Sequence, residues 1–269
     1  MDGVKDIENK IIRATSKSFK EDPLRVYRVA RFASELKFEV EQKTIKMMYE
    51  LKGELNTLSK ERVFCEFRKA LKTNKPSIFF DILREANVLD VHFKEIYDLI
   101  GSLQPIEYHP EGDSYNHSMI AVDNSVNFTD NLLIRYACLV HDLGKSVSTQ
   151  IINGIIRSFG HEYKGVELVK SLIKRITNEN KVLDYTVNMT ELHMKPHSLI
   201  ASSSSIKAYN KMFDLSIEPI DLIYLSICDC LGKVSEIEYI SKEDILFKFL
   251  DIYNEYMSRP YVTGKDLIE

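Results

Sequence analysis

Histidine and aspartate side chains recur between residues 117 and 229 in an order that suits a metal ion. The centre is the pentapeptide His-Asp-Leu-Gly-Lys at residues 141 to 145, with His117 24 residues before it and Asp229 far downstream. Imidazole and carboxylate groups, with positions left open for water, are what a divalent ion used in phosphate hydrolysis prefers. The pattern therefore predicts a divalent-metal site. Mg, Mn, Ni, Co, Fe and Zn all remain open as its metal.

The two central residues restrict where this site can lie. Consecutive helical residues diverge by ~100 degrees, so His141 and Asp142 can share one ion only near a helix end. Gly144 is a natural helix terminator at that point. Lys145 would then lie close enough to donate to a phosphate oxygen. A bare His-Asp dipeptide is usually a surface pair, but the longer ordered set favours a true site.

Other acidic and imidazole side chains leave the composition of the site open. Asp221 precedes Asp229 by eight residues on one predicted helix, so either aspartate can face the site. His161 and His193 fall between the His-Asp pair and the last aspartate, where a site role competes with that of an ordinary polar residue. His197 looks peripheral.

Apolar residues recur at helical spacing almost everywhere, which predicts an all-α fold. The exception is residues 150 to 157, where Asn-Gly between isoleucine pairs predicts one small β-hairpin. Two prolines and two glycines between residues 101 and 112 predict a boundary near residue 100. We thus expect a helical unit at 1–100, a second unit with the metal site at 101–257, and a short end segment at 258–269.

Composition and charge limit the classes of function. With 44% hydrophobic and 28% charged residues, no apolar run of ~20 residues and no signal-peptide pattern at the start, we expect a cytoplasmic protein without membrane contact. Residues 1–80 carry 18 basic against 12 acidic side chains, whereas the remainder carries 18 against 28. A polyanion such as RNA should therefore meet the N-terminal part first.

The region from His117 to Asp229 resembles the HD-domain superfamily of metal phosphohydrolases. That resemblance implies four metal ligands: His117, His141, Asp142 and Asp229. In some HD proteins, histidines ordered like His161 and His193 hold a second metal, and in others they bind phosphate or relay protons. Catalytic roles for His161 and His193 follow from the same comparison, and a catalytic role for Lys145 follows from its position beside the His-Asp pair.

The stretch from Phe19 to Ala33 looks like the neck of the bacterial CCA-adding enzymes and related poly(A) polymerases. In that family a Glu-Asp-x-x-Arg motif recognises the incoming nucleotide, which implies nucleotide-binding roles for Glu21, Asp22 and Arg25. A carboxylate accepting from an exocyclic amine, beside a donating guanidinium, suits a base edge. Similarity continues through the His-Asp motif, and residues 262–268 resemble the start of the family's C-terminal tail.

The resemblance also implies partners. The family's nucleotidyltransferase head should precede this segment, and the sequence does not supply its paired-aspartate metal motif. We therefore expect no nucleotide addition by this chain alone, and a head in cis or in trans as a partner. Basic residues of the neck are expected to contact phosphates of tRNA: Arg28, Arg31, Lys60, Arg62, Arg68 and Lys69.

The predicted function is hydrolysis of a phosphoester at an RNA terminus or on a small nucleotide, such as a 2',3'-cyclic phosphate or a 2'-phosphate, linked to tRNA 3'-end (CCA) processing. Two alternatives stay open. The site can be idle, in a module that binds tRNA or completes a nucleotidyltransferase in trans. Alternatively, the protein can be an HD nucleotidase acting on free nucleotides such as (p)ppGpp or dNTPs.

Overall fold

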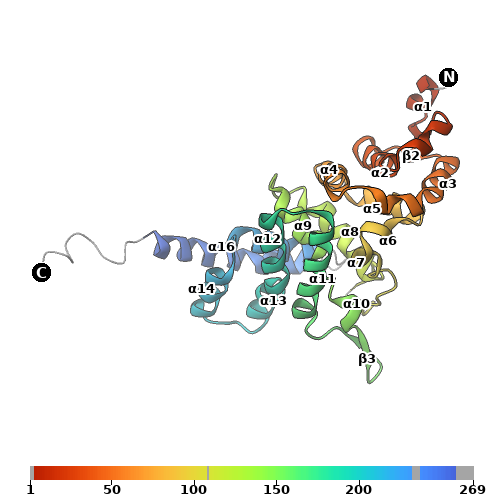
Figure 1. Ribbon diagram of the computed structural model, residues 1–269. Coiled ribbons are helices and arrows are strands. Elements are labelled where there is room, and N and C mark those ends of the chain that lie inside the picture. Colours follow the sequence, from red (N-terminus) through yellow and green to blue (C-terminus); the bar gives the residue numbers. More distant parts are fainter. Residues whose placement is uncertain (1–2, 108, 232–236, 259–269) are drawn as a thin grey trace, which may run out of the picture.

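The computed structural model describes residues 3–107, 109–231 and 237–258 (Figure 1). The expected end segment lies, apart from Ser258, outside these residues. The first helices are α1 (Gly3–Glu8), α2 (Arg25–Leu36), α3 (Gln42–Glu50), α4 (Lys60–Leu71), α5 (Ser77–Glu85), α6 (Leu89–His92) and α7 (Lys94–Tyr97), with 3-10 turns η1 (Lys17–Glu21) and η2 (Lys52–Thr57). The later ones are α8 (Ser114–Ser125), α9 (Leu132–Val140), α10 (Lys145–Ser148), α11 (His161–Ile176), α12 (Asn180–Leu192), α13 (Met194–Ala201), α14 (Ile206–Leu215), α15 (Pro219–Leu231) and α16 (Ile237–Met257).

The predicted helical fold and its hairpin are confirmed. Strands β3 (Gln150–Ile152) and β4 (Ile155–Arg157) pair antiparallel. Asn153 and Gly154 both have positive φ, 52° and 79°, as a two-residue hairpin turn requires. A second small sheet was not predicted: β1 (Ile11–Ile12) pairs in parallel with β2 (Glu39–Val40). Two-residue strands are too short to leave an alternating pattern in the sequence.

One hydrophobic core runs through both halves of the chain. In the neck, Phe67 meets Phe79 and Phe93 at ring-centroid distances of 6.1 and 5.2 Å. The core then crosses into the later helices, where Phe64 on α4 stacks on Tyr136 of α9 at 5.9 Å. Helices on the two sides of residue 100 are thus packed together, and the domain boundary there stays a prediction.

A buried ion pair fixes α11 against the first group of helices. Arg175 on α11 donates two hydrogen bonds of 2.6 Å to the carboxylate of Glu95 on α7. Glu95 is buried, and although burial raises its pKa, the bonds from Arg175 lower it below the usual value. Helix α11 begins at His161, so the ion pair between Arg175 and Glu95 also fixes the position of one side of the candidate site.

Figure 1 shows an elongated molecule with α1 to α3 at one end and α14 and α16 toward the other. The β3–β4 hairpin projects from the side. Among the helices of the described residues, none combines the length and apolar character needed to cross a membrane.

Candidate metal centre

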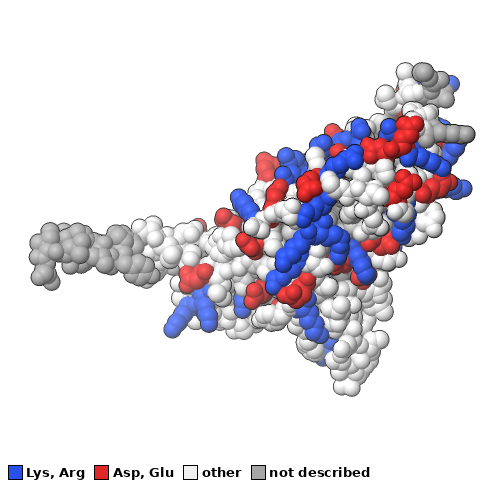
Figure 2. All heavy atoms as spheres, in the orientation of Figure 1, with Lys and Arg blue, Asp and Glu red and all other residues white. Residues whose placement is uncertain are grey.

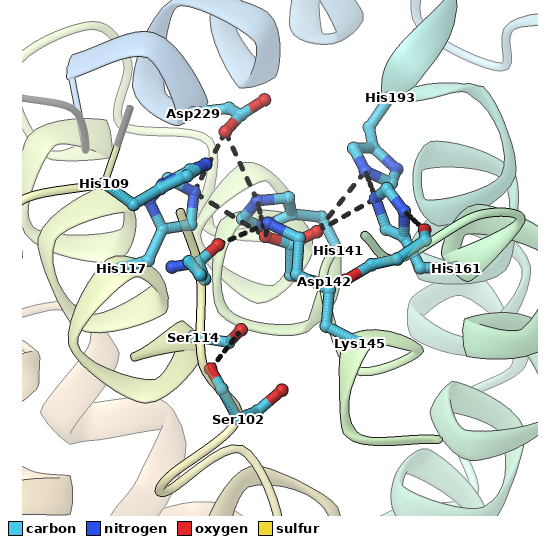
Figure 3. A network of polar contacts seen from close by, with 12 residues as sticks. Ser102, His109, Ser114, His117, His141, Asp142, Lys145, His161, His193 and Asp229 are labelled. Atoms are coloured by element: carbon cyan, nitrogen blue, oxygen red, sulfur yellow. Dashed lines mark hydrogen bonds and ion pairs between the residues drawn. The ribbon is translucent and has the colours of Figure 1, made fainter. Parts of the chain in front are cut away.

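Helix ends and short connections bring the predicted site residues together (Figure 3). Asp113 caps α8 by accepting from the backbone N–H of Asn116 at 3.0 Å, and His117 follows in the first turns of that helix. Asn131 caps α9 by accepting from the N–H of Leu133. Because α9 ends at Val140, His141 and Asp142 lie directly beyond its end. The expectation that this pair needs a helix end is therefore met.

The remaining side chains come from later elements. His161 is the first residue of α11, His193 joins α12 to α13, and Asp229 lies on α15. Each of these residues is buried, as are His117, His141 and Asp142. Six histidine and aspartate side chains thus converge in the protein interior from segments more than 100 residues apart.

The side chains form two groups of three that meet at residues 141 and 142. His117, His141 and Asp229 make the first group, and Asp142, His161 and His193 make the second, each with ligand atoms within 4.8 Å of one another. Nε2 of His117 lies 2.9 Å from Oδ1 of Asp229. In the second group, Oδ1 of Asp142 lies 3.2 Å from Nε2 of His161 and 3.6 Å from Nε2 of His193.

The imidazoles of three of these histidines are oriented by backbone carbonyls. Nδ1 of His141 lies 2.9 Å from the carbonyl oxygen of Cys138, and Nδ1 of His161 and His193 contacts the carbonyls of Ser158 and Thr190 at 2.8 and 2.6 Å. A carbonyl can only accept, so each Nδ1 must carry the proton and donate it. Each Nε2 then turns a lone pair toward the centre, which is the arrangement found in metal-ligating histidines.

The imidazole of His117 is oriented in the same way, but by a carboxylate in place of a backbone carbonyl. Its Nδ1 lies 2.9 Å from Oε1 of Glu111, which leaves Nε2 as an acceptor facing Asp229. Two acceptors at 2.9 Å repel each other unless a cation, a proton or a metal ion, neutralises them. The Nε2 atoms of His161 and His193 are likewise two acceptors in contact, because they lie only 3.1 Å apart. Nε2 of His141 is buried without a hydrogen-bond partner.

The pKa shifts fit a cation site. Burial lowers the pKa of His141 to about 3, so this imidazole is neutral at pH 7. Burial opposes ionisation of Asp142, but Lys145 and His141 bring the pKa of that carboxyl well below its usual range. Burial also opposes protonation of His117, and the hydrogen bonds of Asp229 and Glu111 nevertheless raise its pKa. His141 is thus neutral beside an ionised Asp142, the protonation states that a divalent ion binds, whereas the carboxylates beside His117 favour a positive charge there, from a proton or from a metal ion.

Lys145 lies beside this centre and connects it to a loop. Its Nζ is 2.6 Å from Oδ2 of Asp142 and donates at 2.7 Å to Oε1 of Gln104. The ammonium therefore contacts the oxygen of Asp142 that faces His141 and His117, within reach of a ligand at the centre. The proximity of Lys145 to the His-Asp pair agrees with the expectation from the sequence.

The two aspartates of α15 that the sequence leaves as alternatives have different partners. Oδ2 of Asp221 accepts from the hydroxyl of Tyr185 and from Nδ2 of Asn131, both at 2.7 Å. These contacts tie α15 to α12 and to the start of α9. Asp229, two helical turns later, is the aspartate that lies beside His117.

The expected role of Gly144 as a helix terminator is wrong, because α9 has already ended at Val140 and Gly144 has an ordinary φ of -63°. Its actual role is close packing. A Cβ atom on Gly144 would lie 2.0 Å from the carbonyl oxygen of His161 and 2.7 Å from the backbone nitrogen of Gly165. The glycine lets the His-Asp segment approach the start of α11.

Sequence reasoning missed two side chains at the centre. His197 was taken as peripheral, yet its Nε2 lies 2.8 Å from Oδ2 of Asp229. Glu111 accepts from both His117 and His109, the latter at 2.7 Å, and these hydrogen bonds help lower its pKa to about 2 despite burial. The signals were the spacing of four residues from His193 to His197, and the acidic residue between two histidines in the loop before α8.

Of the three neck residues implicated in nucleotide recognition, only Arg25 is found in the lining of a hollow in the neck. Arg25 and Arg28 line a hollow of about 350 Å³ together with Arg13 and Phe32. Asp22 instead accepts from the N–H of Leu24 and pairs with Arg62 at 3.2 Å. Glu21 is exposed at the end of η1 and is absent from the lining of that hollow. The nucleotide-binding roles of Glu21, Asp22 and Arg25 stay predictions.

Four of the six basic side chains expected to contact RNA have acidic partners within the chain. Arg31 pairs with Glu66 at 2.6 Å, and Lys69 approaches the same carboxylate at 3.4 Å. Arg68 pairs with Glu179, and Lys60 donates to Asn178. Figure 2 accordingly shows blue and red side chains interspersed over this end of the molecule. Their contacts with RNA stay predictions as well.

Comparison with known proteins shows which families the chain resembles. The HD domain family matches residues 107–253, and a family described as the probable RNA- and SrmB-binding site of polymerase A matches residues 37–99. The multifunctional CCA protein of Haemophilus influenzae (strain PittGG) is 39% identical over 217 residues, which cover 77% of this chain and 51% of that protein. Its counterpart in Mannheimia succiniciproducens is 37% identical over 251 residues, 86% and 58% of the two chains.

Solved structures agree in fold. The Thermotoga maritima CCA-adding enzyme complexed with tRNA superposes with a TM-score of 0.57 at 14% identity, over 99% of this chain and 57% of that one. A CCA-adding enzyme complexed with ATP gives 0.57 at 16% identity. The chain spans about half the length of the curated relatives it matches. It belongs to the CCA-adding enzyme family, of which it holds the polymerase-A RNA-binding region and the HD domain.

Proposed function

We propose that the protein is a metal-dependent phosphohydrolase that acts on phosphoesters of nucleotides or RNA ends in tRNA 3'-end processing. The observation that carries this proposal is the orientation of four buried imidazoles. Each has its Nδ1 bonded to a carbonyl or a carboxylate, so that each Nε2 lone pair faces Asp142 or Asp229. Acceptors that face acceptors require a cation between them, and a divalent metal ion supplies it without protonating the imidazoles.

The donor set fits a pair of divalent ions. His117, His141 and Asp229 would hold one, and Asp142, His161 and His193 the other. When bound there, such ions would supply a water of lowered pKa and positive charge for a phosphoryl group. In this proposal His161 and His193 are ligands and not proton donors, because their Nδ1 protons are already donated to backbone carbonyls.

The chain's own side chains then orient the substrate. Lys145 donates to a phosphate oxygen and offsets the negative charge that grows as water attacks phosphorus. Hydrolysis of a 2',3'-cyclic phosphate consumes one water. Its oxygen bonds to phosphorus, one ring P–O bond breaks, and the released ribose oxygen takes up a proton. Buried walls around the site keep other nucleophiles away.

RNA as a partner is the second element of the proposal. It is supported by the match to an RNA-binding region and by the hollow with three arginines in the neck. We extend to this chain the tRNA partner named for the Thermotoga maritima enzyme, and the nucleotide ligand named for the CCA-adding enzyme complexed with ATP. A nucleotidyltransferase head, in cis or in trans, and a cytoplasmic location complete the proposal.

The test is a panel of phosphoesters assayed with Mg, Mn, Co or Ni and with purified parent protein and Asp142→Ala. The panel contains a 2',3'-cyclic mononucleotide, a 2'-phosphate, a free dNTP and RNA with each kind of end. The parent should turn over at least one RNA-terminal or cyclic phosphoester, and Asp142→Ala should not. Inertness of the parent with every metal would favour the alternative of an idle site in an RNA-binding module. Activity on free dNTPs alone would favour the nucleotidase.

A further inference from the structure

The loop between α7 and α8 is closed at its base beside the metal centre. There the carbonyl of Ser102 accepts from the backbone N–H and from the hydroxyl of Ser114, at 3.0 and 3.2 Å. The carboxylate of Asp113 accepts from the backbone N–H of Gly101 at 2.8 Å. Figure 3 shows the two serines just outside the histidine cluster. These contacts fix both ends of the loop, so that side chains between them can be held in defined positions.

Two polar side chains of this loop are buried against the centre. Gln104 is only 4% exposed, and the side chain of Glu111 is only 3% exposed. Asn116 on α8 holds Glu111 in place, because its Nδ2 donates to the backbone carbonyl of that residue at 3.0 Å. Burial of an amide or a carboxylate costs free energy unless hydrogen bonds compensate for it. The partners of these two side chains therefore indicate what each of them does.

Glu111 determines the orientation of one potential metal ligand. Nδ1 of His117 lies 2.9 Å from Oε1 of Glu111, so this imidazole turns Nε2 toward Oδ1 of Asp229, also at 2.9 Å. The other three imidazoles of the cluster are oriented by backbone carbonyls. Of these four rings, His117 is thus the one held by another side chain, and that side chain belongs to the loop.

The remaining contacts of Glu111 support this role. Its Oε1 also accepts from Nδ1 of His109 at 2.7 Å, which holds the carboxylate from the side of the loop. Its Oε2 is buried and has no hydrogen-bond partner among the residues that the structure describes. The two imidazoles therefore account for the hydrogen bonds of this carboxylate. A carboxylate that accepts from a ligating imidazole fixes the ring and strengthens its other nitrogen as a ligand.

Gln104 holds the ammonium of Lys145 in the same way. Its Oε1 must be the atom that faces Nζ of Lys145, at 2.7 Å, because an ammonium cannot accept a hydrogen bond. Nε2 of this amide is buried and finds no acceptor within the described part of the chain. A glutamine that served stability alone should have hydrogen bonds at both ends of its amide. The bond to Lys145 is therefore the reason for its burial.

The ammonium of Lys145 is held by two oxygens on two sides. Oδ2 of Asp142 lies 2.6 Å from Nζ, and Oε1 of Gln104 lies 2.7 Å from it. An ammonium carries three N–H groups, so that one remains for a phosphate oxygen. Without Gln104, the flexible four-carbon side chain would rotate about its contact with Asp142, and the third N–H group would lose its direction.

We infer that the loop between α7 and α8 is a positioning segment of the metal centre. Glu111 orients His117 for an ion held by the first group of ligands, and Gln104 orients Lys145 for a phosphate. The inference rests on the metal centre of the proposed function. It adds two positioning residues whose effects are separable, because Glu111 acts on metal affinity and Gln104 acts on the affinity for an anion.

Cobalt titration, followed by the visible absorption of the bound ion, tests Glu111. Glu111→Met keeps the volume but offers no strong acceptor, and it should weaken one of the two cobalt sites by about 10–100-fold. Glu111→Gln keeps an oxygen that can accept from His117 and should recover most of this loss. Glu111→Asp, which draws the carboxylate back by one methylene, should weaken cobalt binding as well.

The matched control for these variants is Glu107→Met in the same loop, because Glu107 is exposed. It should bind cobalt as the parent does. Equal cobalt affinity of Glu111→Met and Glu107→Met would overturn the positioning role of Glu111. So would a loss in Glu111→Gln as large as that in Glu111→Met.

Binding of inorganic phosphate to the cobalt-loaded protein tests Gln104. Gln104→Met should weaken phosphate binding about tenfold and leave cobalt affinity within about twofold, because Lys145 loses the acceptor that directs it. Gln104→Asn, which withdraws the amide but keeps its polarity, should weaken phosphate binding in the same way. Gln150→Met at an exposed position of β3 is the control and should change neither affinity.

Urea unfolding separates positioning from a structural role of Gln104. The midpoint of Gln104→Met should stay unchanged or rise, since the substitution also removes a buried Nε2 without an acceptor. A lower midpoint together with parent-like phosphate binding would make the glutamine structural and overturn its assigned role.

Neither titration requires turnover, so the inference and the proposed function can fail separately. Weaker cobalt binding by Glu111→Met and weaker phosphate binding by Gln104→Met, in a protein that hydrolyses nothing, would support the inference and contradict the proposed function. Hydrolysis by the parent, with both variants binding like their controls, would leave the proposed function standing and overturn the inference. A parent that binds no cobalt would overturn both.

Discussion

Oδ1 of Asp142 lies 3.2 Å from Nε2 of His161, while Oδ2 of the same carboxylate lies 3.4 Å from Nε2 of His141. One aspartate thus turns one oxygen to each group of potential ligands. Because His141 is its neighbour in the sequence, the two groups are coupled through a single helix end. Any change at Asp142 should therefore affect both groups together.

Lys145→Met is expected to separate catalysis from metal binding. The side chain donates toward Asp142 and Gln104 but offers no lone pair to an ion while it is charged. Loss of its ammonium should lower kcat by about 100-fold, as for other donors that stabilise transition-state charge, with metal content nearly unchanged. Steady-state kinetics and elemental analysis of the same preparation test this. Unaltered kcat would exclude the catalytic role, and loss of metal would make the residue structural.

Substitution of each of the two aspartates of α15 gives a matched pair of variants that separates metal binding from stability. Asp229→Asn should weaken metal binding, because it removes a charge that faces His117. Asp221→Asn should keep the metal but lower the free energy of unfolding by about 1–3 kcal/mol, since Tyr185 and Asn131 lose their charged acceptor in a buried position. Isothermal titration with Mn and denaturant unfolding distinguish the two effects. If the two variants bind metal alike, the choice of Asp229 is wrong.

Gly144→Ala should be severely destabilising, by roughly 3 kcal/mol or more, because the added methyl overlaps backbone atoms of His161 and Gly165 that cannot move independently. Gly53→Ala is the control. A Cβ atom there meets nothing within 4 Å, so this change should be neutral or slightly stabilising. Urea unfolding of both proteins gives the comparison. Equal stabilities would mean that the α10–α11 contact is looser than described.

RNA binding by the neck should depend on salt. Arg28 is exposed and lines the hollow that also holds Arg25. If it contacts one phosphate, Arg28→Ala should flatten the slope of log affinity against log salt by about 0.7–0.9, and hydrolysis of a cyclic mononucleotide should be unaffected. Lys207→Ala on α14, at the other end of the molecule in Figure 1, is the control. A slope equal to that of the parent would remove Arg28 from the interface.

The sequence predicts which side chains converge at the centre, because the His-Asp motif is local and its order is distinctive. It cannot choose between Asp221 and Asp229, since both lie on one face of a helix and only packing against Tyr185 or His117 separates them. The tautomers of the cluster histidines also cannot be predicted from the sequence, because backbone carbonyls determine them in the folded protein.

Other features depend on tertiary contacts that leave no periodic signal. Gly144 was expected to end a helix, whereas its real constraint is the backbone of His161, 17 residues away. The pairing of Arg31 and Lys69 with Glu66 could not be read from charge alone. Gln104 attracted no attention in the sequence, because a glutamine in a loop is ordinary until its partner Lys145 is known.

Metal stoichiometry is the decisive measurement of whether the histidine and aspartate cluster holds two divalent ions. Parent protein dialysed against Mn or Co should retain about two ions per chain by elemental analysis, as two groups of three ligands imply. The double variant His161→Ala, His193→Ala should retain about one, and Asp142→Ala should lose nearly all. If Asp142→Ala carries as much metal as the parent, the cluster is not the metal site and the account is wrong.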